Sequence, residues 1–337
     1  MGSVENLASI FENVVFFDQP LDSWRAGKVT NMASVFKNAK GFNQNINLWP
    51  TDSARDMSSM FKSCWKFNQS INSWQTGSVE TMGAMFKDAG AFNQNINSWQ
   101  TGAVNDFSHT FAEANHFDQP LNSWQTGSVT SPRGMFNFAH EFNQNIDSWQ
   151  TGNFTDMYAM FANNDGFNQP LNSWQTGSAT NIAGVFSGTI VFDQNIDSWQ
   201  TSAVTDMFSV FSSTEAFNQP LDSWQTGSVE RMSAMFQVAK AFNQPLDSWQ
   251  VSSAKHTAVM FQGDERYPRP FNQPLNSWQP TSATMMGGMF YYASSFSQDI
   301  SAWATCSVTP GYYMDFSKDS KLTAGQLPNF SGRANCE

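Results

Sequence analysis

Carboxylate and amide side chains recur at one position of this chain, two residues before a tryptophan. The row begins with Asp22, Asn47 and Asn72 and continues to Asn276. Side chains of an extended segment alternate between its two faces, so we expect this row to point outward. An outward row of oxygen ligands can collect cations or hydrogen-bond the hydroxyls of a glycan. Its acidic members cluster in the later part of the chain, at Asp147, Asp197, Asp222 and Asp247.

A second polar row consists of the threonine two residues after the tryptophan, from Thr76 to Thr226. Regular threonine on a flat face can order water, so ice or surface binding by a Thr/Asn array is an alternative function. Two observations speak against it. The threonines have no second parallel file beside them, and Gly or Ser follows each in a predicted turn.

Other reactive side chains form no catalytic or ligand pattern. The four histidines fall in different repeats without metal-ligand spacing, and no nucleophile is paired with a base. We therefore expect a protein that is not an enzyme and has no cofactor and no metal site. With 17 basic and 28 acidic residues the formal charge is −11, and the basic residues are scattered. That balance argues against nucleic-acid binding, which needs a basic stripe. No apolar run reaches the length of a membrane span.

The polar rows are positioned by an internal repeat. Tryptophan recurs every 25 residues from Trp24 to Trp249 and again at Trp278 and Trp303, after a four-residue insertion near residues 264–270. A fixed period of this length indicates stacked repeats, each burying its apolar face against its neighbours. The prediction is twelve repeats over residues 1–305, followed by a capping segment over residues 306–337.

Each repeat has two phases. Apolar residues at Met32, Val35, Phe36 and Ala39 follow the spacing of one helix face. Thr30 is placed to cap that helix, and the acidic residues of its first turn favour the positive end of the helix dipole: Asp56, Asp106, Asp156 and Asp206. The second phase predicts a short strand around Leu21, Ile46 and Ile71. The expected fold is an α/β repeat solenoid with one short helix and one short parallel strand per unit.

The invariant residues of the repeat are predicted to carry the stack. Gln is the third residue of the Phe-Asn-Gln stretch in all twelve repeats, from Gln19 to Gln298. We favour an amide ladder that bonds one repeat to the next, because buried polar groups need partners; an exposed binding array is the alternative. The tryptophans belong to the core, since twelve exposed indoles would exceed the apolar patch of a soluble monomer.

The run Val-Thr-Asn-Met-Ala-Ser-Val-Phe-Lys-Asn-Ala, followed by Phe-Asn-Gln-x-Ile-x-x-Trp, resembles the BspA-type leucine-rich repeat family of surface proteins. The resemblance covers about residues 3 to 305, with Phe, Met and Trp where leucine is common. It implies a right-handed, leucine-rich-repeat-like stack of helix-plus-strand coils displayed outside cells, with roles in adhesion or recognition and no catalytic residues.

Variation between repeats concentrates in the five residues before each Phe-Asn-Gln phenylalanine. We interpret this edge as a candidate partner surface, with neutral drift of a solvated loop as the alternative. Its aromatic and charged residues are Trp65, His116, His140, Tyr267, Arg269, Tyr291 and Tyr292. Trp65 is the one tryptophan out of register with the series.

The sequence also predicts roles for the three cysteines and for the two ends of the chain. Cys64 replaces the alanine of other repeats and is predicted to be a small core residue. Cys306 and Cys336 bracket the tail, where a disulfide would hold the capping segment over the stack. Met1 leads into the first repeat without a signal peptide, so the chain is either intracellular or part of a longer precursor, and we favour the precursor.

Together these features predict a non-enzymatic, extracellular or cell-surface module for adhesion to, or recognition of, a protein or glycan. A purely structural spacer and the ice-binding array are the alternatives. We expect a monomer or weak self-association, with no nucleic acid and no membrane span.

Overall fold

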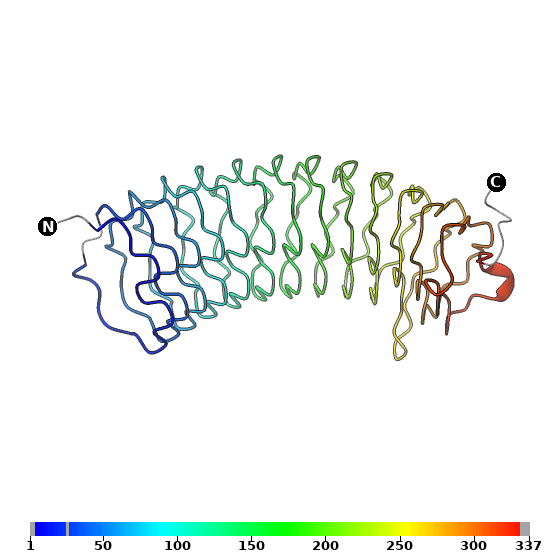
Figure 1. Cartoon of the computed structure of the whole chain (residues 1–337), viewed down its shortest axis with the longest axis horizontal. Coiled ribbons are helices and arrows are strands. Elements are labelled where there is room, and N and C mark those ends of the chain that lie inside the picture. The colour runs from blue at the N-terminus through cyan, green and yellow to red at the C-terminus, as the bar shows by residue number, and fades with distance from the viewer. Residues whose placement is uncertain (1–3, 25–26, 331–337) are drawn as a thin grey trace. The chain divides into compact units, whose positions relative to one another are not determined.

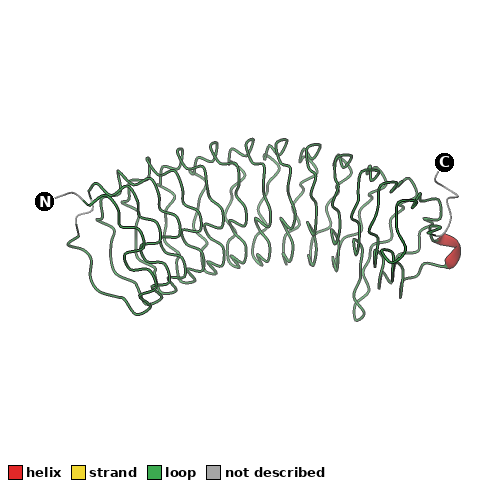
Figure 2. Ribbon diagram, viewed as in Figure 1, coloured by secondary structure: helices red, strands yellow, loops and turns green. Residues whose placement is uncertain are grey.

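The repeats fold as coils of turns, without the predicted helices and strands. A computed structural model describes residues 4–24 and 27–330. Within these residues the only helix or strand is η1, a single turn of 3-10 helix over Ala324–Gln326 (Figure 2). The prediction of an α/β, leucine-rich-repeat-like solenoid with a helix and a strand per unit is therefore wrong.

The chain divides into two compact units, Met1–Trp174 and Gln175–Glu337. Within each unit successive coils lie side by side (Figure 1). Isolated parallel bridges join equivalent residues of neighbouring coils, such as Asn31 to Asp56 in the first unit and Asp206 to Arg231 in the second. These bridges lie in the segment predicted to be helical. The segments around Leu21, Ile46 and Ile71 form turns, because Trp49 N–H donates to the Ile46 carbonyl 3.0 Å away.

A ribbon of overlapping turns replaces the expected helix. The backbone N–H groups of alternate residues (Met32, Ser34, Phe36 and Asn38) donate to carbonyls of the next coil over 2.8–2.9 Å. Between them, the N–H groups of Lys37 and Ala39 donate to carbonyls three residues earlier in their own coil, over 3.1 and 2.8 Å. The backbone thus satisfies its donors partly within one coil and partly between coils, whereas a helix satisfies them internally.

Two residues of most coils have a left-handed backbone, which is incompatible with a helix. In the second coil these are Ser34 at φ 57° and Asn38 at φ 60°. Glycine occupies the same positions at Gly134, Gly184, Gly188 and Gly288. For other residues this conformation costs about 1–2 kcal/mol. The short inter-coil hydrogen bonds made by the same N–H groups offset that cost.

The predicted helix caps have other partners. Asp56 Oδ1 accepts a hydrogen bond from Ser58 N–H at 2.8 Å, and Asp106, Asp156 and Asp206 do the same two residues ahead. This is an Asx-turn, a short-range contact that favours turns over helix. Thr30 donates its hydroxyl to the Glu5 carbonyl of the preceding coil at 3.3 Å, so it does not cap a helix.

The core consists of aromatic rows, as predicted. Two phenylalanines of each coil, such as Phe36 and Phe42, stack with ring centroids 3.9–4.4 Å apart. Tryptophans of neighbouring coils are nearly parallel at 5.8–6.5 Å. Each buried indole N–H reaches back to the preceding coil, as Trp74 does to the Ile46 carbonyl at 3.1 Å. Cys64 is fully buried, and burial raises the pKa of its thiol.

The amide ladder exists and lies at the half-buried edge of the coils. Asn218 Oδ1 accepts from the backbone N–H of Asn243 at 2.9 Å and from Gln244 Nε2 at 3.1 Å. The same pair of bonds recurs between Asn43 and the next coil, with Asp118 in place of Asn further along. The conserved Asn or Asp and Gln of each repeat are therefore used in stacking.

The insertion and the tail both belong to the second unit. The four-residue insertion follows Gly263 and projects as a yellow loop beyond its neighbours in Figure 1. Residues 306–330 continue the ladder, because Met286 and Gly288 donate to the carbonyls of Tyr312 and Met314 over 2.8 and 2.9 Å. Their role as a cap stays a prediction. Cys336 lies outside the described residues, so its pairing with Cys306 stays a prediction as well.

Candidate functional site

The Asx–Ser row lies on the outside of the coils. We define it as the Asp or Asn two residues before a core tryptophan, from Asp22 to Asn276, together with the serine that follows it in all of these coils except the one with Leu48. Asp197 accepts from Ser223 of the next coil through both carboxylate oxygens, at 2.9 Å from the backbone N–H and 2.7 Å from the hydroxyl. Asp247 binds Ser277 in the same way, and Asp147 accepts from Ser173 N–H at 2.9 Å. Three of the four predicted carboxylates thus bond to the next coil.

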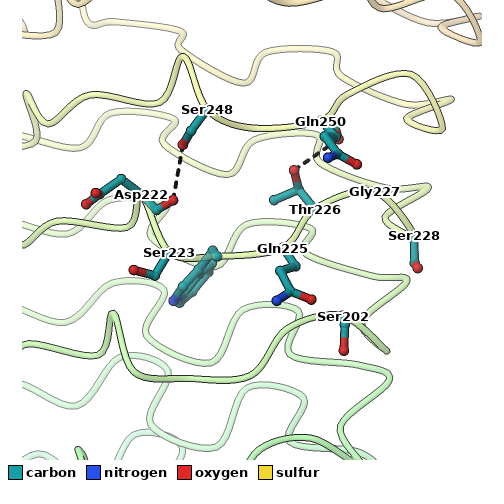
Figure 3. Close-up of a pocket in the computed structure, with 10 residues that line it drawn as sticks. Ser202, Asp222, Ser223, Gln225, Thr226, Gly227, Ser228, Ser248 and Gln250 are labelled. Carbon is teal, nitrogen blue, oxygen red and sulfur yellow. Dashed lines mark hydrogen bonds between the residues drawn. The ribbon is translucent and has the colours of Figure 1, made fainter.

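Asp222 differs because it is exposed and is one of the residues that line a groove in the second unit (Figure 3). The groove has a volume of about 430 Å³. Apart from the edge of buried Trp224, its lining is polar or small: Ser202, Asp222, Ser223, Gln225, Thr226, Gly227, Ser228, Ser248 and Gln250. Hydroxyls and amides dominate this lining, so the groove offers hydrogen bonds and little apolar area.

The groove walls are fixed by bonds between coils. Ser248 donates its hydroxyl to the Asp222 carbonyl at 3.1 Å, and Thr226 donates to the Gln250 carbonyl at 3.0 Å (Figure 3). Gly227 lies under the Gln250 side chain, whose Oε1 would be 2.8 Å from a Cβ at that position. Gly77, Gly102, Gly127 and Gly177 have the same relation to the glutamine of the following coil. Ser202 stands at the same position of the preceding coil, so the glutamine side chain can move aside for a larger residue.

The first unit has a second groove on the same row. It has a volume of about 420 Å³ and is lined by Asn72, Asn95, Asn97, Ser98 and Ser123. Here Asn97 holds its neighbours in place, donating to Asn122 Oδ1 at 2.9 Å and accepting from Ser123 N–H at 3.0 Å. The Asx–Ser row therefore borders a polar groove in each unit, with amides in the first and a carboxylate in the second.

The threonine row is buried. Thr76, Thr101, Thr126 and Thr201 are at most 2% exposed. Each hydroxyl donates to a glutamine carbonyl of the next coil, as Thr101 does to Gln125 at 3.0 Å. Thr101 also accepts the N–H of Gln125 at 2.7 Å. The threonine row is thus closed by the adjacent coil, and the ice-binding alternative stays a prediction.

The variable residues form the turn flank, which we define as residues 37–41 and their equivalents in the other coils. In the first unit, basic side chains of the flank lie close to carboxylates one repeat away. Lys37 lies 2.9 Å from Glu12, His116 Nδ1 2.7 Å from Glu141, and His140 Nδ1 2.8 Å from Asp165. The two predicted histidines are thus engaged with carboxylates, while Trp65 is 49% exposed.

In the second unit the predicted flank residues differ in exposure. Tyr267 is 61% exposed at the tip of the insertion, whereas Arg269 is 7% exposed and lies 4.0 Å from Asp264. Arg269 therefore does not present its guanidinium to a partner. Tyr291 and Tyr292 are half-buried, with ring centroids 4.2 Å apart. A hydrogen bond to Tyr291, with desolvation and the Glu265 carboxylate adding to it, raises the pKa of Tyr292 to about 12.

Two absences apply to residues 4–24 and 27–330. No group of three or more His, Cys, Asp or Glu side chains is arranged to hold a metal ion. In the same part of the chain, no helix combines the length and the apolar character needed to cross a bilayer. The Asx–Ser row is thus a source of hydrogen bonds between coils and along its grooves, and its carboxylates are not gathered as metal ligands.

Stacked coils, a repeated motif and grooves formed between coils define a tandem-repeat protein. A family model described as "Mycoplasma protein of unknown function, DUF285" matches residues 1–99, 70–174, 155–270 and 266–325. The overlapping matches span nearly the whole chain, and the chain belongs to this repeat family. They do not extend to the BspA-type assignment. Neither a curated protein nor a solved structure matches the chain.

Sequence reasoning found the Asx–Ser row and Trp65 but missed their surroundings. Gln225 and Ser228 line the groove, and neither was assigned a role from the sequence. Lys40 and Gly90, which lie one repeat before and after Trp65, were also missed. Aligning the variable positions column by column would have placed both beside Trp65.

Proposed function

We propose that this chain is a non-enzymatic recognition module of the cell surface or extracellular space that binds glycans along the Asx–Ser row. The observation that carries the proposal is the groove beside Asp222, with its lining of hydroxyls, amides and one carboxylate. Sugar hydroxyls donate and accept hydrogen bonds, so such a lining fits them. An apolar ligand would need the hydrophobic lining of an ordinary small-molecule pocket.

Repetition supports the same role. A similar groove borders the row in the first unit, and the motif that forms these walls recurs every 25 residues. Several weak sites in one chain raise the overall affinity for a ligand that is itself repetitive. A polysaccharide is such a ligand. The resemblance of the repeats to BspA-type surface proteins supports an extracellular location and a role in adhesion.

The test is binding of the purified chain to immobilised neutral polysaccharides, compared with two variants. Ser228→Tyr fills the groove from an exposed position, and we expect it to weaken binding about tenfold, as loss of a central contact does. Ala216→Tyr is the matched control, because the equivalent flank positions already hold His116, Glu141 and Val191.

Equal binding by Ser228→Tyr and Ala216→Tyr would refute the groove as the site. Absence of polysaccharide binding together with capture of a defined surface protein would favour protein recognition instead. Binding of neither would leave the structural spacer as the function of the stack.

A further inference from the structure

Trp65 lies at the centre of a basic patch in a chain that is acidic overall. Its indole is 49% exposed, and the formal charge of the whole chain is −11. Lys40 Nζ lies 3.7 Å from the centre of the indole ring. Exposed Lys66 is the next residue in the chain, and Lys62 lies on the same flank. Positive charge and an exposed aromatic face are therefore combined at one place.

These lysines differ from the other flank cations of the first unit. Lys37 and Lys87 each have a carboxylate one repeat away, at 2.9 and 3.2 Å. Among residues 4–24 and 27–174, no carboxylate lies within ion-pair distance of Lys40, Lys62 or Lys66. Three lysines without an ion-pair partner among these residues thus lie on the flank of Trp65, and the Asp88 carboxylate beside the indole offsets one of their charges.

Lys40 packs on Trp65 from one side, and open space borders the equivalent position of the following coil. Lys40 belongs to the preceding coil, because flank residues stack one repeat apart, as Asn38 N–H does on the Lys62 carbonyl. Lys40 therefore covers the indole from the side of the preceding coil. In the following coil the equivalent residue is Gly90, and a Cβ added to it would meet nothing within 4 Å.

Two contacts fix the orientation of the Trp65 indole. Its Nε1 donates to Asp88 Oδ2 of the following coil at 3.0 Å, and Lys40 packs on the covered face. The backbone at Gly90 borders open space, which we call the slot, next to the half-exposed indole of Trp65. A flat ring can enter the slot without displacing a side chain.

We propose that this slot binds a sugar ring of an anionic polysaccharide, with sulfate or carboxylate groups on the ligand paired to Lys40, Lys62 and Lys66. Aromatic faces contact the apolar face of a sugar ring, and clustered lysines supply the attraction to an anion. The site belongs to the first unit and does not depend on the groove beside Asp222. Its ligand is distinguished from that of the groove by charge.

Dextran sulfate and dextran are suitable probes, because they share a sugar backbone and differ in charge. Polyglutamate has charge without sugar rings. We expect the wild-type chain to bind dextran sulfate in preference to both, with an affinity that falls as salt is raised, because exposed charges are screened. Isothermal titration calorimetry measures all three affinities.

Four variants locate the site. Trp65→Ala removes the stacking face and Gly90→Trp fills the slot, and each should weaken dextran sulfate binding about tenfold or more, as loss of an aromatic anchor does. Gly90→Ala adds a methyl group in open space and should bind like the wild type. Lys321→Gln removes one exposed charge from the second unit and should also leave binding unchanged.

Three results would overturn the proposal: no binding of dextran sulfate by the wild type, equal binding of polyglutamate, or unchanged binding by Gly90→Trp. Thermal unfolding of each variant shows whether it is folded. If Gly90→Trp fails to fold, Trp65→Ala decides, because Trp65 is half-exposed and outside the buried tryptophan row. Ser228→Tyr, which tests the groove, should keep its affinity for dextran sulfate, so the two proposals can fail separately.

Discussion

Gly263 is the position where the coil before the insertion comes closest to the next coil. Its N–H donates to the Tyr291 carbonyl at 2.7 Å. A Cβ placed on Gly263 would lie 2.0 Å from the carbonyl oxygen of Tyr292 and 2.7 Å from its carbonyl carbon. Both are backbone atoms, so no side-chain rotation relieves the overlap. Gly263→Ala must therefore push two coils apart or distort the start of the insertion.

The expected loss of stability in Gly263→Ala is the balance of two opposing effects. Forcing an extra carbon into a packed region typically costs about 1–3 kcal/mol. Replacing glycine by alanine also restricts the unfolded chain, which stabilises the fold by about 0.4–1 kcal/mol. We expect a net destabilisation of about 1–2 kcal/mol, equivalent to a fall of roughly 2–8 °C in Tm for a unit of this size.

Thermal and urea unfolding, followed by tryptophan fluorescence, measure this loss. Gly325→Ala is the control in the same unit, because a Cβ there meets nothing within 4 Å. It should leave Tm unchanged or raise it slightly. If Gly263→Ala were as stable as Gly325→Ala, the close approach of the two coils would be refuted.

Three further predictions concern the turns and ladders. Val238 has φ 57°, a backbone conformation that strains valine more than asparagine, so Val238→Asn should raise the free energy of unfolding in urea by about 1 kcal/mol. The same gain in Val191→Asn, where φ is not positive, would contradict this explanation. Asn218→Ala leaves two donors without an acceptor and should cost about 1–2 kcal/mol, whereas Asn218→Asp keeps the acceptor and should cost less. Burial, with Lys87 and Arg133 nearby, lowers the pKa of His109 in the folded chain. The stability that neutral His109 contributes is therefore fully present above the unfolded pKa of about 6.5 and is lost as the pH falls through the folded pKa. The urea midpoint should therefore fall less on acidification in His109→Asn, and an identical pH dependence would exclude His109 as its source.

The buried set was predictable from the repeat because every coil meets nearly the same neighbours. Met32, Val35, Phe36 and Ala39 are all fully buried, as their spacing indicated. The conformation that buries them was not predictable from that spacing, since a helix and a ribbon of overlapping turns expose the same face. A local signal did exist. Serine, asparagine and glycine recur at the two left-handed positions, and these residues favour turns over helices.

The candidate sites, too, were predictable from the sequence only in part. The Asx–Ser row and Trp65 were visible in the sequence as a periodic polar position and a break in the tryptophan series. Whether a polar row is exposed was not visible, because the threonine row has the same period and is buried. The difference depends on the direction of each turn relative to the next coil.

The sequence by itself determined the period, the stacking of equivalent residues and the membership of the aromatic core, since a strict repeat of large apolar residues can be buried only against copies of itself. The tertiary structure decided where the backbone hydrogen bonds go. Asn38 N–H finds its acceptor in Lys62 of the next coil. A bond between residues so far apart in the chain leaves no trace in local periodicity. That choice formed turns where the sequence predicted a helix.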